Sequence, residues 1–427
     1  MRVAIIGAGI VGVTSAFELA ADGHQVTVFE RHASVASEAS FANAGVIAPG
    51  YVTPWAAPGM PMKVLAHLFG RHAPVRFGGI NALAHLPWMW RWWRACNPAI
   101  HQANRGRMYS LAKYSQQRLQ ALTQSLELEY DQARGVLVLL RSARDLARAQ
   151  GSLRMLSELQ VPFELLDAAQ CRYLEPGLNA DMPLAAAISL PQDGVGNCRQ
   201  FAQQLRAQAQ ARGARFLLRH EVQALVAGAL PRVVARDLGT PATGRGTSAA
   251  VAALDLEFDA VVVCAGHQAN RLLRPLGLAL PIIAVYGHSL TAALRVDDAH
   301  AATAPRGAVM DEKFKVAVSR LGQRIRVAGS AELGGAPDRM NEAALATLYK
   351  VLDDWFPGAA SLSQVQRWKG ARPMLPDGPP VLGSSRSAGI WLNLGHGSSG
   401  WALACGSARV LADLMARREP AIDITGL

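Results

Sequence analysis

The first thirty residues alternate between apolar runs and glycine-marked breaks. Val3–Ile6 is a short, wholly apolar run that predicts a buried strand. Val11–Ala21 has helical character, and Gly23 is a typical stop after it. Gln25–Phe29 then predicts a second strand. Strand, glycine turn, helix and strand within about 30 residues have the size of a βαβ unit, so we expect the chain to begin in a parallel sheet.

Similar patterns continue to the C-terminus and predict an α/β protein. Helical patterning covers Arg105–Leu128, Ser142–Leu159, Arg199–Gln210, Asn341–Trp355 and Trp401 to about Arg417. Apolar runs predict strands at Phe216–Leu218, Asp259–Cys264, Ile282–Tyr286, Lys315–Val318, Ile325–Val327 and Ile390–Leu394. We expect a turn at Pro191–Gly196, and a β-meander over Glu221–Leu256 with a loop at Gly239–Gly246.

Composition and charge exclude several classes of protein. Half of the 427 residues are apolar, so the chain can bury enough surface to offset the entropy lost on folding, and its length predicts two or three packed units. The net charge is +11, but the arginines that dominate it are scattered without a block of five like charges, which argues against nucleic-acid binding. A basic surface facing anionic lipid stays an open interpretation. No apolar stretch of about 18 residues occurs, so no membrane-spanning helix is expected.

The cysteines are five in number and far apart, at positions 96, 171, 198, 264 and 405. No CxxC pair or Cys/His cluster occurs. We therefore expect neither a disulfide framework nor a metal site, and a reducing compartment is the simplest interpretation.

A glycine motif follows the first predicted strand. Residues 7–12 read Gly-Ala-Gly-Ile-Val-Gly and open the predicted helix. Gly7 permits the tight turn, Gly9 lets a pyrophosphate approach the backbone, and Gly12 permits close packing of helix on strand. The helix N-terminus offers free N–H groups to the phosphates, and Glu30, 18 residues after Gly12, is placed to accept from ribose hydroxyls. The motif predicts a dinucleotide site.

A second motif of the same form stands near the C-terminus, where residues 395–400 read Gly-His-Gly-Ser-Ser-Gly. The chain ends about 27 residues later without a clear strand, so no second βαβ unit is expected. One interpretation is that this loop aims a helix N-terminus at a ligand already bound, which in a flavoenzyme is the ring edge where negative charge accumulates on reduction. The other is a plain tight turn.

Further motifs extend the picture along nearly the whole chain. They are the loop Ser40–Gly45, Gly50-Tyr51, Pro54–Gly59, Gly370-Ala371-Arg372-Pro373 and Pro376-Asp377-Gly378. Together with the two glycine loops, they resemble the flavin-dependent D-amino acid dehydrogenases of the D-amino acid oxidase and glycine oxidase superfamily. The resemblance implies FAD, oxidation of D-amino acids to 2-oxo acids and ammonia, and electron transfer to a quinone or other respiratory-chain acceptor. It also implies a cytoplasmic location with peripheral contact at the inner membrane.

The resemblance implies two domains. A Rossmann-like FAD-binding domain is expected from the discontinuous segments 1–50, 190–275 and 365–427. An α+β substrate domain with a mixed or antiparallel sheet is expected from residues 51–189 and 276–364.

It also assigns roles to individual residues. Glu30 and Arg31 would hold the adenosine ribose, Val222 would meet the adenine through its backbone, and Ala265 and Gly266 would pack near the FAD. The remaining expected cofactor residues lie in the glycine loops, the first strand and the loop after the second strand: Val3, Gly7, Ala8, Gly9, Ile10, Val11, Gly12, Ser40, Asn43, Ala44, Gly45, Gly395, His396, Gly397 and Gly400.

Arg372 is the strongest candidate for substrate binding. A guanidinium matches a carboxylate with two parallel hydrogen bonds, and the flanking Gly-Ala and Pro constrain the backbone that carries it. Tyr51, Tyr286 and His288 are further candidates, each with a structural role as the alternative. The chain departs from the family pattern at Leu375, where Thr is usual, and at Tyr286–Ser289, where Lys-Gly-Tyr-Ser is usual.

Several alternatives stay open. The substrate could instead be D-proline, D-hydroxyproline, glycine or an N-methyl amino acid, and the acceptor could be oxygen. An NAD-dependent dehydrogenase that uses only the first glycine motif, or a flavin-carrying partner subunit, are other classes. The Trp-Met-Trp-Arg-Trp-Trp-Arg run at 88–94 has two interpretations: an aromatic helix packed under the substrate domain, or a surface at a membrane interface.

Overall fold

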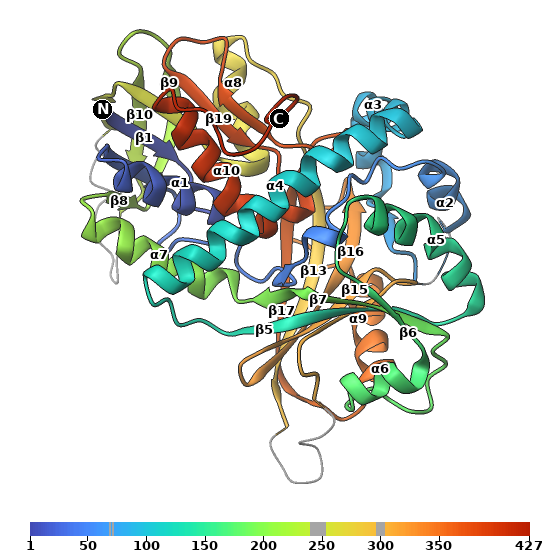
Figure 1. Ribbon diagram of the computed structural model, residues 1–427. Helices are drawn as coiled ribbons and strands as arrows, with labels where there is room; N and C mark the ends of the chain where they lie inside the picture. Colours follow the sequence, from blue (N-terminus) through green and yellow to red (C-terminus); the bar gives the residue numbers. More distant parts are fainter. Residues whose placement is uncertain (68–69, 71, 240–252, 296–303) are drawn as a thin grey trace, which may run out of the picture.

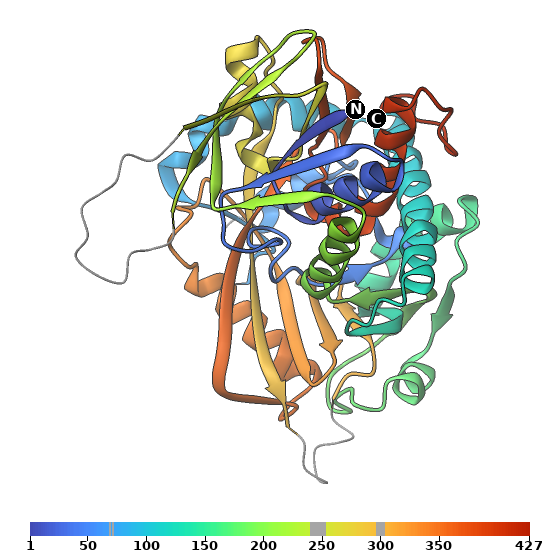
Figure 2. The same cartoon turned by 90° about the vertical axis from the view of Figure 1, so that its left-hand side faces the viewer.

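The computed structural model describes residues 1–67, 70, 72–239, 253–295 and 304–427. Three sheets organise this part of the chain (Figure 1). Seen from the side, the two smaller sheets, A and C, occupy the upper half of the molecule and the large sheet, B, the lower half (Figure 2).

Sheet A has six strands in the order β18-β19-β12-β1-β2-β8, all parallel except β18. Their bounds are β1 Arg2–Ile6, β2 Gln25–Glu30, β8 Arg215–Leu218, β12 Ala260–Val263, β18 Val381–Ser384 and β19 Ile390–Leu394. One face packs on α1 (Ile10–Ala21), α7 (Cys198–Ala211) and α10 (Gly400–Met415). The predicted opening βαβ unit is confirmed, with its two strands paired in parallel.

The other face of sheet A packs on sheet C and α8 (Ala269–Leu273). Sheet C is an antiparallel meander of β9 (His220–Val226), β10 (Arg232–Asp237) and β11 (Ala253–Glu257). This confirms the meander predicted there. Most of the loop expected at Gly239–Gly246 falls in 240–252, which lie outside the described residues.

Sheet B is a mixed sheet of ten strands, in the order β17-β13-β16-β15-β14-β5-β7-β3 with β4 on β16 and β6 on β7. Its strands are β3 Val46–Ile47, β4 Val75–Phe77, β5 Gln132–Leu140, β6 Glu164–Leu166, β7 Ala186–Gly196, β13 Ile283–Leu294, β14 Ala308–Asp311, β15 Val316–Leu321, β16 Arg324–Leu333 and β17 Ala360–Met374. One face packs on α9 (Glu342–Trp355) and α6 (Ala168–Leu174), and α5 (Ala143–Glu158) packs on the other. A parallel sheet beside a large mixed one confirms the expected α/β class.

The turn predicted at Pro191–Gly196 is wrong, because these residues complete β7. The register between β5 and β7 shifts at this place, where Leu190 pairs with Val136 and Gly194 already pairs with Arg134. A bulge tolerates a proline that lacks an N–H, and it explains why turn-forming residues stand inside a strand.

Three helices lie along the chain between strands of sheet B: α2 (Met60–His67), α3 (Leu86–Ala95) and the long α4 (Pro98–Ser125). The last of these packs on α10 of the other half and crosses it diagonally in Figure 1. The helix predicted from Arg105 therefore begins one to two turns earlier. Asn97 caps it by accepting from the amides of Ala99 and Ile100. In the described part of the chain, no helix is long and apolar enough to cross a membrane.

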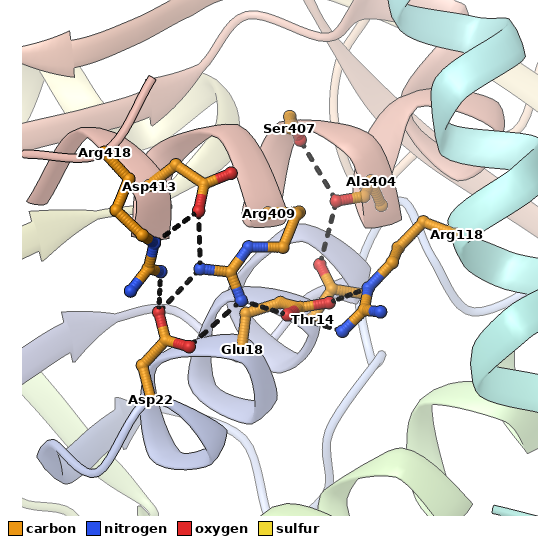
Figure 3. Close-up of polar contacts among 9 residues, drawn as sticks. All are labelled: Thr14, Glu18, Asp22, Arg118, Ala404, Ser407, Arg409, Asp413 and Arg418. Carbon is orange, nitrogen blue, oxygen red and sulfur yellow. Dashed lines mark hydrogen bonds and ion pairs between the residues drawn. The ribbon is translucent and has the colours of Figure 1, made fainter. Parts of the chain in front are cut away.

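A buried ionic network locks α1, α4 and α10 together (Figure 3). The side chain of Glu18 in α1 has no exposed surface and pairs with Arg118 of α4 at 2.6 Å and Arg409 of α10 at 2.9 Å. Arg409 also pairs with Asp22 at 2.6 Å and with Asp413 at 3.0 Å. Nearby, the Thr14 hydroxyl donates to the Ala404 carbonyl at 3.2 Å. These contacts fix the two helices whose N-termini face the cavity described next.

Candidate active site

A cavity of about 1320 Å³ lies where the carboxyl ends of the sheet A strands meet one face of sheet B. Gly7 follows β1, Ala265 follows β12 and Gly395 follows β19, and all three line it. Crevices at the carboxyl ends of parallel strands are the usual ligand sites of such sheets. The volume exceeds the range of about 300–1,000 Å³ that is typical for small ligands, so there is room for a dinucleotide and a substrate together.

Most of the expected cofactor residues line this cavity. Three do not: Val3 lies in the core of sheet A, Ala8 is fully buried, and Gly12 packs against the first strand turn. The lining includes Gly7, Gly9, Ile10, Val11, Glu30, Arg31, Ser40, Asn43, Ala44, Gly45, Val222, Ala265, Gly266, Gly395, His396, Gly397 and Gly400.

The first glycine loop has the shape that a pyrophosphate site requires. Gly7 has φ +100°, and a Cβ there would lie 2.8 Å from the Cys264 carbonyl oxygen. A Cβ on Gly12 would lie only 1.9 Å from the Gly7 carbonyl oxygen, so α1 packs directly on the loop. The helix has no capping side chain at Gly9 and no acidic residue in its first turn. Its N-terminus therefore offers backbone donors and positive charge to an anionic ligand.

The end of β2 forms a polar corner of the cavity. The Glu30 carboxylate accepts from the backbone amides of Ala8 and His32, both at 2.8 Å, which fixes its position. Arg31 donates to Glu38 and Gln268. The hydrogen bond from His32, together with the charge of Arg31, lowers the pKa of Glu38 to about 2. Glu38 and Gln268 line the cavity but were not among the residues predicted.

The loop Ser40–Gly45 is held in place by sheet B. Ser289 of β13 donates to the Ala42 carbonyl at 2.8 Å, and Ser319 of β15 donates to the Ala44 carbonyl at 2.9 Å. Arg326 of β16 donates to the Asn43 carbonyl at 3.2 Å. The loop is therefore fixed against sheet B, on the wall of the cavity.

The second glycine loop presents the N-terminus of α10 to the same cavity. Residues 395–402 all line it, and α10 has neither a capping side chain nor an acidic residue in its first turn. His396 is buried with its Nε2 3.0 Å from the Ser407 hydroxyl, and burial lowers its pKa to about 3. The side chain thus stays neutral and braces the loop. In the described residues no strand follows α10, in line with the sequence analysis.

Arg372 lies on β17 and reaches the cavity. Its Nη1 donates to the Ser330 carbonyl oxygen at 2.7 Å, and among the described residues it has no carboxylate partner. Burial lowers its pKa to about 10, so the guanidinium is still charged at neutral pH. A charge that is partly withdrawn from water without a counterion is unfavourable, and this one is placed to receive an anion from a ligand.

Two residues that were not predicted set the position of that guanidinium. Gly287 lies opposite it on β13, and a Cβ there would come within 2.3 Å of Arg372 Nη2. Ser330, whose carbonyl accepts from Arg372, has φ +62°, a conformation that is strained for serine. It sits where the pairing of β13 with β16 shifts register. Such bulges re-aim side chains near active sites.

Tyr51 lines the cavity with its hydroxyl already engaged. It donates to Glu312 Oε2 at 2.8 Å, and Lys315 Nζ donates to it at 3.1 Å. Burial, together with the Glu312 charge, raises the pKa of Tyr51, so the phenol keeps its proton. Glu312 and Lys315, in the turn between β14 and β15, line the cavity too, and no motif in the sequence singles them out.

The other two candidate residues, His288 and Tyr286, differ in their position relative to the cavity. His288 lines the cavity but is almost wholly buried, and its Nε2 accepts from the Asn341 amide at 3.4 Å. Burial lowers its pKa to about 4, so it is neutral at physiological pH. Tyr286 is not among the described residues that line the cavity. Its ring centroid lies 4.5 Å from the Lys369 ammonium instead. The structure therefore groups Arg372, Tyr51 and His288 around the cavity, without Tyr286.

The geometry fits a bound dinucleotide beside an anionic substrate, and comparison with known proteins specifies which cofactor. A family model described as FAD dependent oxidoreductase matches residues 2–414. The chain belongs to this family of FAD-dependent oxidoreductases. FAD is therefore its cofactor, and the resemblance found in the sequence is confirmed.

Relatives of this oxidoreductase match it over its whole length. The D-amino acid dehydrogenase of Rhizorhabdus wittichii is 43% identical over 429 residues, covering 99% of this chain and 98% of the relative. That of Bradyrhizobium diazoefficiens is 40% identical over 431 residues, covering 100% and 98%. The crystal structure of glycine oxidase from Geobacillus kaustophilus shares the fold, with a TM-score of 0.75 at 21% identity over 99% of this chain and 96% of that one.

Proposed function

We propose that this oxidoreductase is a D-amino acid dehydrogenase. It oxidises the α-carbon and amine of a D-amino acid to an imine, which water then hydrolyses to a 2-oxo acid and ammonia. Full-length relatives that carry this name support the assignment, at 40% and 43% identity. In the structure, the supporting observation is the guanidinium of Arg372, which lies part-buried at the cavity with no carboxylate partner among the described residues.

Arg372 would bind the substrate carboxylate. With one N–H used by the Ser330 carbonyl, the guanidinium keeps other donors for a two-point contact with a carboxylate. FAD, when bound, supplies the acceptor for the hydride that leaves the α-carbon. A carboxylate fixed at one point orients that carbon, and the rest of the cavity then decides which enantiomer fits.

The sheet B wall of the cavity would receive the substrate side chain. Its lining is apolar and comes from five adjacent strands: Val138, Ile188, Leu190, Met310, Ala317 and Ala328. Apolar walls exclude water around the reacting carbon and favour apolar side chains. Tyr51, His288 and the Glu312–Lys315 pair would then contribute polar contacts around the substrate, without an uncompensated charge on the phenol or the imidazole at neutral pH.

We propose that the chain forms two domains, each built from separate segments of the sequence. Residues 1–50, 190–275 and 365–427 would form the FAD-binding domain, since they carry all strands of sheets A and C. Residues 51–189 and 276–364 would form the substrate domain. The N-termini of α1 and α10, with the loop Ser40–Gly45, would hold the pyrophosphate and the flavin.

The electron acceptor would be a quinone or another component of a membrane respiratory chain, reached by peripheral contact at the cytoplasmic face. Turnover with a quinone analogue, accompanied by little hydrogen peroxide, is the result that would support this proposal. Stoichiometric peroxide release in air would identify an oxidase instead.

Replacing Arg372 tests the proposed substrate site directly. Arg372→Met should raise the D-alanine concentration needed for half-maximal flavin reduction at least a hundredfold, because the carboxylate loses charged hydrogen bonds worth about 3 kcal/mol. Stopped-flow absorbance at the flavin band measures this. Arg367→Met, on the same strand and half exposed, is the matched control and should behave like the wild type. Equal half-saturation in both variants would contradict the assignment.

A further inference from the structure

The run of tryptophans at 88–94 divides into two sets in the structure. Trp88 is buried and its indole donates to the Met374 carbonyl at 3.2 Å, and Trp92 packs in the same apolar cluster. Trp90 and Trp93 point away, with 59% and 53% of their surface exposed and ring centroids 5.0 Å apart. The packed interpretation from the sequence therefore accounts for only half of the cluster.

Further exposed apolar side chains lie on the neighbouring elements at the same edge of the molecule, and we call the whole set the α2–α3 face. It comprises exposed side chains on α2, α3 and the 3-10 helix between them (Gly79–His85): Met62, Leu65, Leu83, Leu86, Trp90 and Trp93. Both helices lie at the same edge of the molecule, at the upper right of Figure 1. Monomeric proteins rarely expose large apolar side chains in such number together, so the surface points to a partner.

The segment of chain that carries this face has charges of one sign only. From residue 39 to residue 126 the chain contains no Asp or Glu, whereas it contains nine Lys or Arg. Arg91 and Arg94 are exposed on α3, close in sequence to Trp90 and Trp93, whereas Lys63 of α2 lies on the side of the helix that lines the cavity. A surface of tryptophan, leucine and methionine mixed with cations alone complements an anionic, apolar-centred partner.

The face adjoins the substrate cavity through α2. Met60 and Val64, one helical turn apart, line the cavity, whereas Met62 and Leu65 on other sides of the helix are exposed. Whatever covers the α2–α3 face therefore lies next to a wall of the cavity, separated from it by a single helix.

We propose that the α2–α3 face is the surface by which this protein docks on a bilayer containing anionic phospholipid. Indoles suit the headgroup layer, leucine and methionine enter the acyl boundary, and Arg91 and Arg94 pair with phosphates. Docking in this orientation brings the cavity wall formed by α2 to the membrane. That last step rests on the proposed membrane acceptor, whereas the docking surface itself does not.

A second copy of the chain fits the same face less well. A two-fold contact places the same patch on both partners, so the cations of one face would meet those of the other with no carboxylate between them. An anionic bilayer supplies both the apolar layer and the opposite charge.

Vesicle co-sedimentation of the FAD-loaded protein tests the proposal. The probes are vesicles of phosphatidylcholine alone and of phosphatidylcholine mixed with phosphatidylglycerol. The wild type should bind the mixed vesicles at least tenfold more tightly than the neutral ones. Trp90→Ser with Trp93→Ser, and separately Arg91→Glu with Arg94→Glu, should each weaken binding to the mixed vesicles at least tenfold.

Tyr173→Ser with Leu362→Ser is the matched control, since these side chains are 83% and 55% exposed on other elements. It should bind vesicles like the wild type. Flavin content and D-amino acid oxidation with a soluble dye should be unchanged in all variants, which separates loss of docking from loss of fold or of the proposed function. The proposal would be overturned if the wild type bound neither kind of vesicle, or if the tryptophan and arginine double variants bound the mixed vesicles like the wild type. A dimer in solution that Trp90→Ser with Trp93→Ser dissociates would also overturn it, in favour of a second copy.

Discussion

At the scale of single residues, the site depends on how one guanidinium is held. Arg372 is part-buried, charged and without a carboxylate partner in the described chain, and its position follows from two neighbours on the strands β13 and β16. The Ser330 carbonyl accepts from it, and Gly287 leaves the space that it fills. Both neighbours lie at the irregular part of the β13–β16 pairing. The local shift in strand register thus determines where the Arg372 guanidinium lies.

Gly287→Ala tests this arrangement. Its Cβ would lie 2.3 Å from Arg372 Nη2, so the guanidinium must move away from the position that we propose for the substrate carboxylate. We expect KM for D-amino acids to rise about 10- to 100-fold, equivalent to about 1.5–3 kcal/mol, with a smaller change in kcat. Gly106→Ala in α4, where a Cβ meets nothing within 4 Å, is the control. If both variants keep the wild-type KM, Gly287 has no role in placing Arg372.

At the scale of elements, the cavity depends on two helices aimed from opposite ends of the chain. α1 follows the first strand and α10 follows the last, yet they pack side by side on sheet A. Glu18 joins them through Arg409 and joins α1 to α4 through Arg118 (Figure 3). The pairing holds both N-termini toward the cavity, so this network contributes to the shape of the cavity although it does not line it.

Glu18→Ala should therefore destabilise the whole assembly. It leaves Arg118 and Arg409 without a shared partner, although Arg409 keeps Asp22 and Asp413. We expect the free energy of unfolding to fall by about 3 kcal/mol, as measured by urea denaturation with saturating FAD. Arg418→Ala removes a half-exposed partner of the same network and should lower the free energy of unfolding clearly less than Glu18→Ala does. Equal losses in the two variants would show that burial of Glu18 is unimportant.

At the scale of the whole molecule, two buried imidazoles make stability depend on pH. Burial lowers the pKa of His288 to about 4 and that of His396 to about 3, from 6.5 in the unfolded chain. Between pH 6.5 and 4 these two imidazoles bind more protons in the unfolded chain than in the folded one. Their contribution to the free energy of unfolding is therefore complete above pH 6.5, and it declines as the pH falls through this window.

From pH 7 to pH 5 each of these histidines should cost about 2 kcal/mol of stability. Denaturant midpoints at the two pH values measure the loss. His288→Gln and His396→Gln should each reduce the difference between the two pH values by that amount, whatever they do to stability at pH 7. A difference that is the same in the wild type and in both variants would mean that neither group is held neutral.

The sequence anticipated most of the cofactor side of this molecule, because that side is built from local patterns. A strand, a glycine loop and a helix are contiguous in sequence at 3–21 and again at 390–415, so their periodicity and glycines are visible there. The substrate side depends on pairings between distant strands. The strand through Pro191, the left-handed backbone of Ser330 and the Glu312–Lys315 pair leave no local signal, since each is set by partners far along the chain.

The central claim is that this FAD-dependent oxidoreductase oxidises D-amino acids. The most direct test is the visible spectrum of the purified, FAD-loaded protein under anaerobic conditions, before and after addition of D-alanine or L-alanine. Bleaching of the flavin band by the D-isomer alone is the predicted result. An oxidised flavin that responds only to the L-isomer, or to glycine or N-methyl amino acids but not to any D-amino acid, would contradict the claim.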